Sequence, residues 1–296
     1  MYVSKLTEKK GPLGEGPSAF PVVHVYLDAE HAQALQRVLE PFTLGKNKNH
    51  AALKAIFKDE HYFPQKILSR LEALRDEKHC RTVFMLHGLP EITPREVTGT
   101  PIVEREFLQN LLMKESYAVY ISQGIGLALG LKPTANGNQS LFALVRYSGD
   151  SAYDGSSLHK HDEAVTTLSG LYSHGEKTRF TDWESLLREV SLNPEYRDIE
   201  IECSKTGTTR MTLAKFAEKF SQWKHQYNFE IDATSGHEDR FEELLARHSQ
   251  HVHVGHGDMA MWSNDGPLLH QALPSEKLDG PPRLRRVAVG RAMNRA

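Results

Sequence analysis

The chain has 296 residues, of which 39 % are hydrophobic and 25 % are charged, and its formal net charge is −2 at pH 7. That composition predicts a folded protein with a sizeable core and excludes a chain that is disordered throughout. A net charge so close to zero offers no global attraction to nucleic acid or to an anionic membrane, so we expect neither partner and favour a small molecule.

The first part of the chain is predicted to be rich in helix. In chain order, apolar spacing and turn signals predict a strand over 21–27, a helix capped by Asp28 and reaching Phe42, a second helix around 67–74, an apolar strand over 82–90 and a mostly helical stretch over 104–128. Because nothing resembling a linker follows, we expect residues 1–135 to flank the rest of a single domain that spans residues 1–296.

From Leu141 onward, short strands separated by turn signals replace the helical pattern. The predicted strands lie at 141–145, 158–165, 168–173, 251–254, 259–262 and 284–289. Helices are predicted at 182–190, where Thr181 and Glu184 form a capping-box pattern, around 212–226, and along the stripe from Phe241 to His248. We therefore expect an α+β fold in which residues 136–296 form a β-sandwich core with a helical insertion at about 182–250.

A glycine-rich segment, "GIGLALG", looks like a loosened dinucleotide-binding fingerprint. It supplies Gly124, Gly126 and Gly130, but it lies at the end of a helical stretch, whereas the fingerprint follows a strand. We therefore interpret these glycines as small residues that allow close helix packing.

The cellular compartment is indicated only by features that the sequence lacks: a spanning helix, a signal region and paired cysteines. No stretch approaches the ~20 apolar residues of a spanning helix, and the first twenty residues lack an apolar signal region. Cys80 and Cys203 are far apart and show no paired spacing, so neither a disulfide framework nor a cysteine-rich zinc site is predicted. A reducing, cytoplasmic compartment fits this pattern.

The stretch "LHKHDEAV", residues 158–165, places His159, His161 and Glu163 at every second position. On a strand these three side chains would share one face, because successive residues point to opposite sides. A histidine and a carboxylate so spaced can fill two neighbouring positions around a metal, and a distant histidine can complete a 2-His-1-carboxylate triad on Fe(II). Solvated surface residues are the alternative interpretation of this motif.

Three other segments are similar, in the same order, to motifs of the clavaminate synthase and taurine dioxygenase branch of the Fe(II)/2-oxoglutarate oxygenases. They are "FMLHGLP" at 84–90, "YSHGEKTRFTDWESLLREV" at 172–190, and "GDMAMWSNDGPLLH" at 257–270 followed by "PPRLRRVAVGRA" at 281–292. The resemblance covers residues from about 82 to 291 as short islands. It implies a double-stranded β-helix, or jelly-roll, core flanked by helices.

The same resemblance implies a set of functional residues and cosubstrates. The Fe(II) ligands it implies are His161, Glu163 and His270. Thr178 would help to hold 2-oxoglutarate, and Arg286, or alternatively Arg283, would bind its far carboxylate, since a guanidinium is a planar and permanently charged fork. With O2 as the other cosubstrate, the expected activity is a dioxygenase, most simply a hydroxylase, that acts on an amino acid or an amino-acid-derived small molecule.

Several alternatives stay open at this stage. The apolar Leu158 directly precedes His159, which suits the first histidine of the family motif and would put His161 at the carboxylate position. That register gives either a three-histidine site or a site that relies on a different acid. We favour His161 with Glu163 because a carboxylate then stands at the right spacing. The histidines at 251, 253 and 256 could instead bind zinc. Asp265, where the family usually has arginine, leaves a non-catalytic β-sandwich binding protein possible; oligomeric state is not predicted.

Overall fold

A computed structural model describes much of the chain. The described residues are 20–43, 49–77, 80–90, 116–133, 141–147, 157–161, 163–173, 177–204, 208–223, 229–273 and 284–294. Side chains are not described at 133, 141–147, 172–173, 221–223, 229 and 284–287. Arg283 lies outside the described residues, as does the beginning of the helical stretch predicted from residue 104.

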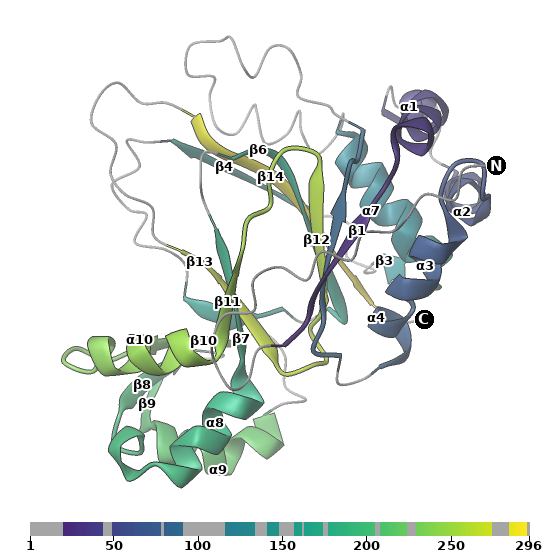
Figure 1. Ribbon diagram of the computed structural model, residues 1–296. Helices are drawn as coiled ribbons and strands as arrows, with labels where there is room; N and C mark the ends of the chain where they lie inside the picture. The colour runs from purple at the N-terminus through teal and green to yellow at the C-terminus, as the bar shows by residue number, and fades with distance from the viewer. Residues whose placement is uncertain are drawn as a thin grey trace.

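Two sheets lie at the centre of the protein (Figure 1). The first has the order β1-β2-β12-β6-β14-β3, with β4 also paired to β14; its strands are β1 Val22–Tyr26, β2 Val83–His87, β3 Lys132–Pro133, β4 Leu141–Tyr147, β6 Val165–Ser173, β12 Asp258–Ser263 and β14 Leu284–Asn294. The second has the order β11-β7-β13-β5-β10-β8-β9; its strands are β5 Leu158–Lys160, β7 Thr178–Asp182, β8 Glu200–Ser204, β9 Thr208–Thr212, β10 Phe229–Ala233, β11 Ser249–Val252 and β13 Leu268–Ala272.

Eight of these strands form a jelly roll. In chain order β4, β5, β6, β7, β11, β12, β13 and β14 belong to the first, second, first, second, second, first, second and first sheet. All pairings among them are antiparallel. This order of crossing between two antiparallel sheets is the double-stranded β-helix, so the predicted α+β jelly-roll fold is confirmed.

The core between the two sheets is built from alternating strand residues. Trp262 and Ala260 of β12 pack there with Phe180 of β7 and Leu268 of β13. The intervening Met259 and Met261 of β12, as well as Phe84 and Leu86 of β2, belong to a second cluster on the outer side of the first sheet. Strand alternation thus gives β12 two buried faces, and the strand predicted at 259–262 is confirmed.

Helices cover the outer face of each sheet (Figure 1). The helices α1 Ala29–Thr43, α2 His50–Lys58, α3 Gln65–Leu71, α4 Ala73–Asp76 and α7 Tyr117–Ala128 pack on the first sheet through that second cluster. The helices α8 Trp183–Leu192, α9 Leu213–Trp223 and α10 Glu238–Arg247, together with the short 3-10 helix η1 Pro194–Tyr196, supply a third cluster with Leu158, Ile201 and Ile231 of the second sheet.

The predicted helical insertion at about 182–250 is only partly helical. Its strands β8, β9 and β10 extend the second sheet beyond β5, with β10 paired to both β5 and β8. In β8, Ile201 and Cys203 are buried and alternate with more exposed polar residues, which is the pattern of a strand with one covered face. The capping box predicted at Thr181 is also wrong by one residue, because Asp182 caps α8 by accepting a hydrogen bond of 3.1 Å from the Ser185 amide.

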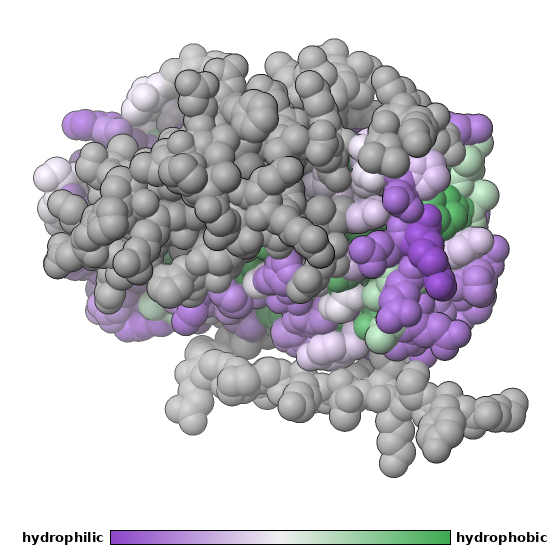
Figure 2. Space-filling view, turned by 90° about the horizontal axis from the view of Figure 1, so that it is seen from above, coloured by the Kyte–Doolittle hydropathy of each residue, from purple (hydrophilic) through white to green (hydrophobic). Residues whose placement is uncertain are grey.

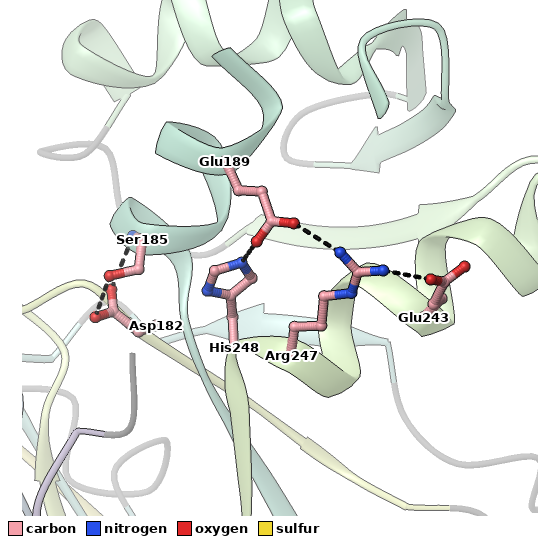
Figure 3. Close-up of polar contacts among 6 residues, drawn as sticks. All are labelled: Asp182, Ser185, Glu189, Glu243, Arg247 and His248. Atoms are coloured by element: carbon pink, nitrogen blue, oxygen red, sulfur yellow. Dashed lines mark hydrogen bonds and ion pairs between the residues drawn. The ribbon is translucent and has the colours of Figure 1, made fainter. Parts of the chain in front are cut away.

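Polar contacts attach α10 to α8 within this insertion (Figure 3). His248, just after α10, lies 2.5 Å from a carboxylate oxygen of Glu189 in α8. Arg247 donates to the other oxygen of Glu189 at 3.0 Å and to Glu243 at 2.5 Å. His248 and Glu189 are the least exposed of the four, so solvent screens their interaction less than that of the exposed Arg247–Glu243 pair.

The structure confirms the predicted cap at Asp28 and the predicted close packing at two of the three glycines. The Asp28 carboxylate accepts a hydrogen bond of 3.0 Å from the His31 amide at the start of α1. Gly124 and Gly126 lie within α7, and a Cβ at these positions would stand 2.1 Å from the Phe57 ring and 2.0 Å from the Met293 sulfur, respectively. Gly124 and Gly126 therefore allow α7 to approach both α2 and β14 closely. The packing interpretation is wrong for Gly130, because nothing lies within 4 Å of a Cβ there and its φ of +81° instead suits the residue that follows the end of a helix.

The described surface seen from above is mainly hydrophilic (Figure 2). Among the described residues, Tyr26 and Leu192 are the large hydrophobic side chains that remain exposed, at 46 % and 74 %. No helix in the described ranges combines the length and the apolar character that crossing a membrane requires.

Candidate metal centre

The stretch 158–165 does not form the single strand that its alternation predicts. Strand β5 ends at Lys160, and β6, in the other sheet, begins at Val165. Between them the chain bends at Glu163 and Ala164, where Asn264 holds both carbonyl groups: its side-chain amide donates to Glu163 at 2.7 Å and its backbone amide to Ala164 at 2.8 Å. The chain leaves β5 because it must cross between the sheets.

His159 and His270 face each other across the antiparallel pair β5–β13. They are direct register partners, and their ring centroids are 4.2 Å apart. His270 also contacts Trp262 and Phe180, at centroid distances of 4.7 and 6.1 Å, so both histidines lie on the face that is turned toward the other sheet. The neighbouring Lys160 lies on the opposite face, where its ammonium group is 3.4 Å from the Gly266 carbonyl.

His161 completes a group of three histidines. Its Nε2 is 3.1 Å from Nε2 of His270, and one ring nitrogen from each of His159, His161 and His270 lies within 4.8 Å of the others. In the described part of the chain this is the only group of three or more histidine, cysteine or acidic side chains that is so close. The structure thus brings His161 and His270 together, and the Glu163 carboxylate is not part of the group.

Burial keeps these histidines neutral. Desolvation, followed by the neighbouring His159, lowers the pKa of His161 from 6.5 to about 4. Desolvation is also the largest cause that lowers the pKa of His159 and of the fully buried His270. A neutral imidazole keeps a free lone pair on one nitrogen, and that is the form that binds a metal ion.

The geometry of the three rings fits a metal ion. Two ligand nitrogens about 2.1 Å from a metal and at right angles to each other are about 3 Å apart, close to the spacing of His161 and His270. The Nδ1 atom of His159 donates to the Ser157 carbonyl oxygen at 2.7 Å, which leaves Nε2 of that ring as the lone-pair nitrogen. Nδ1 of His270 is buried without a hydrogen-bond partner among the described residues, so this ring lacks the contact that usually orients a metal-binding histidine.

The predicted cosubstrate residues are described to different degrees. Thr178 is buried at the start of β7, opposite Ala272 of β13 and two residues from Phe180, so it occupies the same face of the second sheet as His270. Arg286 lies in β14, in register with Ser173 of β6 and Arg146 of β4, but its side chain is outside the described part of the structure. Arg283 lies outside it altogether.

The structure also contains a buried arginine that sequence reasoning missed. Arg291 of β14 is only 7 % exposed, and burial lowers its pKa to about 10. It shares a strand face with Met293, which packs against the helices, and the side chain interacts with Tyr120 of α7. Arg291 therefore lies on the side of the sheet that faces away from the three histidines. Its neighbours in the sequence are apolar strand residues, and nothing in that pattern predicted that the arginine itself is buried.

The other histidine-rich segment does not assemble a comparable group. The His256 ring lies 2.6 Å from the Leu171 carbonyl, and His251 lies beside Arg179 of β7 at 3.4 Å. Neither of them, nor His253, joins a group of three close ligand atoms among the described residues. Asn264 is fully buried and also binds Trp262 and Thr166.

Comparison with known proteins agrees with this architecture. A solved asparagine oxygenase matches with a TM-score of 0.54 at 13 % identity, over 92 % of this chain and 93 % of that one. Another asparagine oxygenase structure, in complex with Fe(II), hydroxyasparagine and succinate, matches with a TM-score of 0.53 at 12 % identity, over 92 % and 94 %. The non-heme iron oxygenase OrfP in complex with Fe gives a TM-score of 0.53 at 12 % identity, over 92 % and 93 %.

The chain therefore has the fold of the non-heme iron oxygenases. At 12–13 % identity, the likeness to these structures shows the fold alone. It confirms the fold that the resemblance of the sequence motifs implied. No protein-family model and no curated protein sequence matches the chain. The histidine group occupies the space between the two sheets of this fold.

Proposed function

We propose that the protein is an Fe(II)- and 2-oxoglutarate-dependent dioxygenase that hydroxylates an amino acid or an amino-acid-derived small molecule. The observation that carries the proposal is the partly buried His161–His270 pair, whose Nε2 atoms are 3.1 Å apart inside a fold shared with non-heme iron oxygenases. The substrate class rests on those similar structures, of which one holds hydroxyasparagine and another, of OrfP, holds a hydroxyarginine.

Two protein ligands of the proposed iron are His161 and His270. The sequence offers two candidates for the third, Glu163 and His159. A facial set of three protein ligands leaves three coordination positions for cosubstrate and oxygen, and this supports an oxygenase over a purely structural site. Thr178 on the same sheet face, and Arg286 two residues before the core residue Ala288, are the proposed contacts for 2-oxoglutarate.

The protein's own residues would position the reactants and exclude water. When bound, Fe(II) supplies the oxidising chemistry: one atom of O2 enters a C–H bond of the substrate, and the other enters succinate as 2-oxoglutarate loses CO2. Trp262 and Phe180 pack against the His270 ring and hold it in a dry environment. An arginine that binds the far carboxylate of 2-oxoglutarate fixes its orientation through a bidentate contact.

A zinc site is a second candidate, because three histidines are also a known ligand set for catalytic zinc. An anaerobic titration of metal-free protein with Fe(II) and then 2-oxoglutarate separates the two. The dioxygenase predicts a visible charge-transfer band after the second addition, followed by succinate release when O2 and an amino-acid panel are supplied. Iron binding without any effect of 2-oxoglutarate, or tight binding of zinc alone, would contradict it.

The partners and location in this proposal follow the sequence. A small-molecule substrate is proposed, without nucleic acid or membrane. Cys80 and Cys203 are buried and form no disulfide bond, which supports a cytoplasmic location.

A further inference from the structure

We propose that the third protein ligand of the iron is His159 and not Glu163, so that the metal is held by His159, His161 and His270; this presupposes the iron site of the proposed function. His161 then stands where the related motif has its carboxylate. The centre would be a three-histidine site inside a fold whose motif otherwise supplies two histidines and one acid.

Strand pairing is the first observation in favour of His159. It is the direct register partner of His270, and the two centroids are 4.2 Å apart, the shortest of the three ring separations. In an antiparallel pair, directly opposite residues share a face and have side chains within about 5.5 Å of each other. His159 is therefore held toward the metal position by the backbone hydrogen bonds of the sheet.

The hydrogen bond to Ser157 is the second observation. The His159 ring donates from Nδ1 to the Ser157 carbonyl at 2.7 Å. A histidine that binds a metal through one nitrogen usually donates from the other to a carbonyl or carboxylate, which fixes both the tautomer and the ring orientation. His159 has this arrangement, with Nε2 left for the metal.

Glu163 is placed differently. It lies beyond the end of β5 in the bend that crosses to β6, and its backbone carbonyl is fixed by the Asn264 side chain at 2.7 Å. Its carboxylate is absent from the group of ligand atoms within 4.8 Å that the three histidines form. Its backbone is thus anchored by a fully buried asparagine outside the strand that carries His159.

The ligand set changes the charge of the centre. Three neutral imidazoles leave the full charge of Fe(II) on the site, whereas a carboxylate ligand would neutralise one unit of it. Because attraction between opposite charges is strong in a buried site, small anions should bind more tightly to a three-histidine centre. Azide is a convenient probe of this difference, since it can occupy a position left open by the protein.

Four variants discriminate the two ligand sets in anaerobic Fe(II) titrations. His159→Ala should weaken Fe(II) binding by more than about 100-fold, beyond the loss expected for a supporting contact. Glu163→Gln should bind iron within about threefold of wild type. His161→Glu, which restores two histidines and one acid at the motif spacing, should retain binding. His251→Ala, at a histidine outside the group, is the matched control, and circular dichroism checks that each variant folds.

The outcomes separate this ligand set from the proposed function itself. Loss of iron binding in Glu163→Gln and in His161→Glu, with binding retained in His159→Ala, would overturn the three-histidine site while the dioxygenase stands. Wild type that binds no Fe(II) would overturn both. If His159→Ala does not fold, pulsed electron paramagnetic resonance of the wild-type Fe(II)–nitrosyl complex counts the imidazoles: three support His159, and two overturn it.

Discussion

The Nε2 atom of His161 lies 3.1 Å from that of His270; the first ring is partly buried and the second is buried. Without metal, neither ring gains from protonation in the folded state, because burial lowers the pKa of His161 to about 4. The unfolded chain binds that proton near pH 6.5. Above about pH 6.5 His161 is neutral in both states and does not reduce the stability of the fold. As the pH falls toward about 4, the unfolded chain binds the proton first, and the free energy of unfolding decreases.

We expect the free energy of unfolding of the metal-free protein to decrease by about 2 kcal/mol between about pH 6.5 and pH 5 from His161 alone. Urea unfolding in the presence of a chelator measures it. In His161→Asn the dependence on pH should be shallower over the same interval. An identical slope in both proteins would show that His161 does not have a lowered pKa.

Asn264→Ala should destabilise the protein by about 3 kcal/mol or more. The Asn264 amide donates to Glu163 and Thr166, and its oxygen accepts from the Trp262 indole at 3.1 Å. Truncation leaves these buried groups without partners, and each such group costs about 1–3 kcal/mol. Chemical denaturation measures the loss. Asn49→Ala, which removes an exposed cap of α2, is the comparison and should cost only about 1 kcal/mol.

Most of the jelly roll could be predicted from local pattern. The strands near 141, 168, 259 and 284 are apolar runs bounded by turn signals, and the structure has strands at each. The strands β8, β9 and β10 were missed because they lie in a predicted helical insertion, and their exposed sides carry residues such as Glu200 and Arg210. A short strand with one solvated face gives a weak signal on its own.

The sequence predicted that His161 and His270 belong to the candidate site. It did not predict which residue of β5 lies opposite His270. His161 and His270 follow from the motif order, whereas the place of His159 depends on which residue of β5 pairs with His270 of β13. That pairing is between segments 111 positions apart in the numbering, and a slip of one residue turns every side chain to the other face. The bend at Glu163 likewise depends on the distant Asn264.

Gly124→Ala should destabilise the helical layer. A Cβ at residue 124 would stand 2.1 Å from the Phe57 ring, so α7 and α2 would have to separate. Overpacking of this kind typically costs about 1–3 kcal/mol. Thermal unfolding of the variant measures the effect, and a change below about 0.5 kcal/mol would contradict the close packing inferred for this helix.

Gly236→Ala is the contrasting case for that measurement. Nothing lies within 4 Å of a Cβ at residue 236, but its backbone φ is +89°. The substitution therefore carries only backbone strain, of about 1–2 kcal/mol. Because Gly124 lies inside a helix and has no positive φ, backbone strain explains a loss of stability at Gly236 alone, and a loss at Gly124 reports the contact with Phe57.

Cys203 should be unreactive in the folded protein. Its side chain is buried in the cluster beneath α8 and α9, and burial raises the pKa of the thiol to about 11. Because the thiolate is the nucleophile, an Ellman titration at about pH 8 should detect no rapid reaction of this residue in native protein. In guanidinium both Cys80 and Cys203 should react. Rapid modification of Cys203 under native conditions would show that the insertion opens and exposes β8 to solvent.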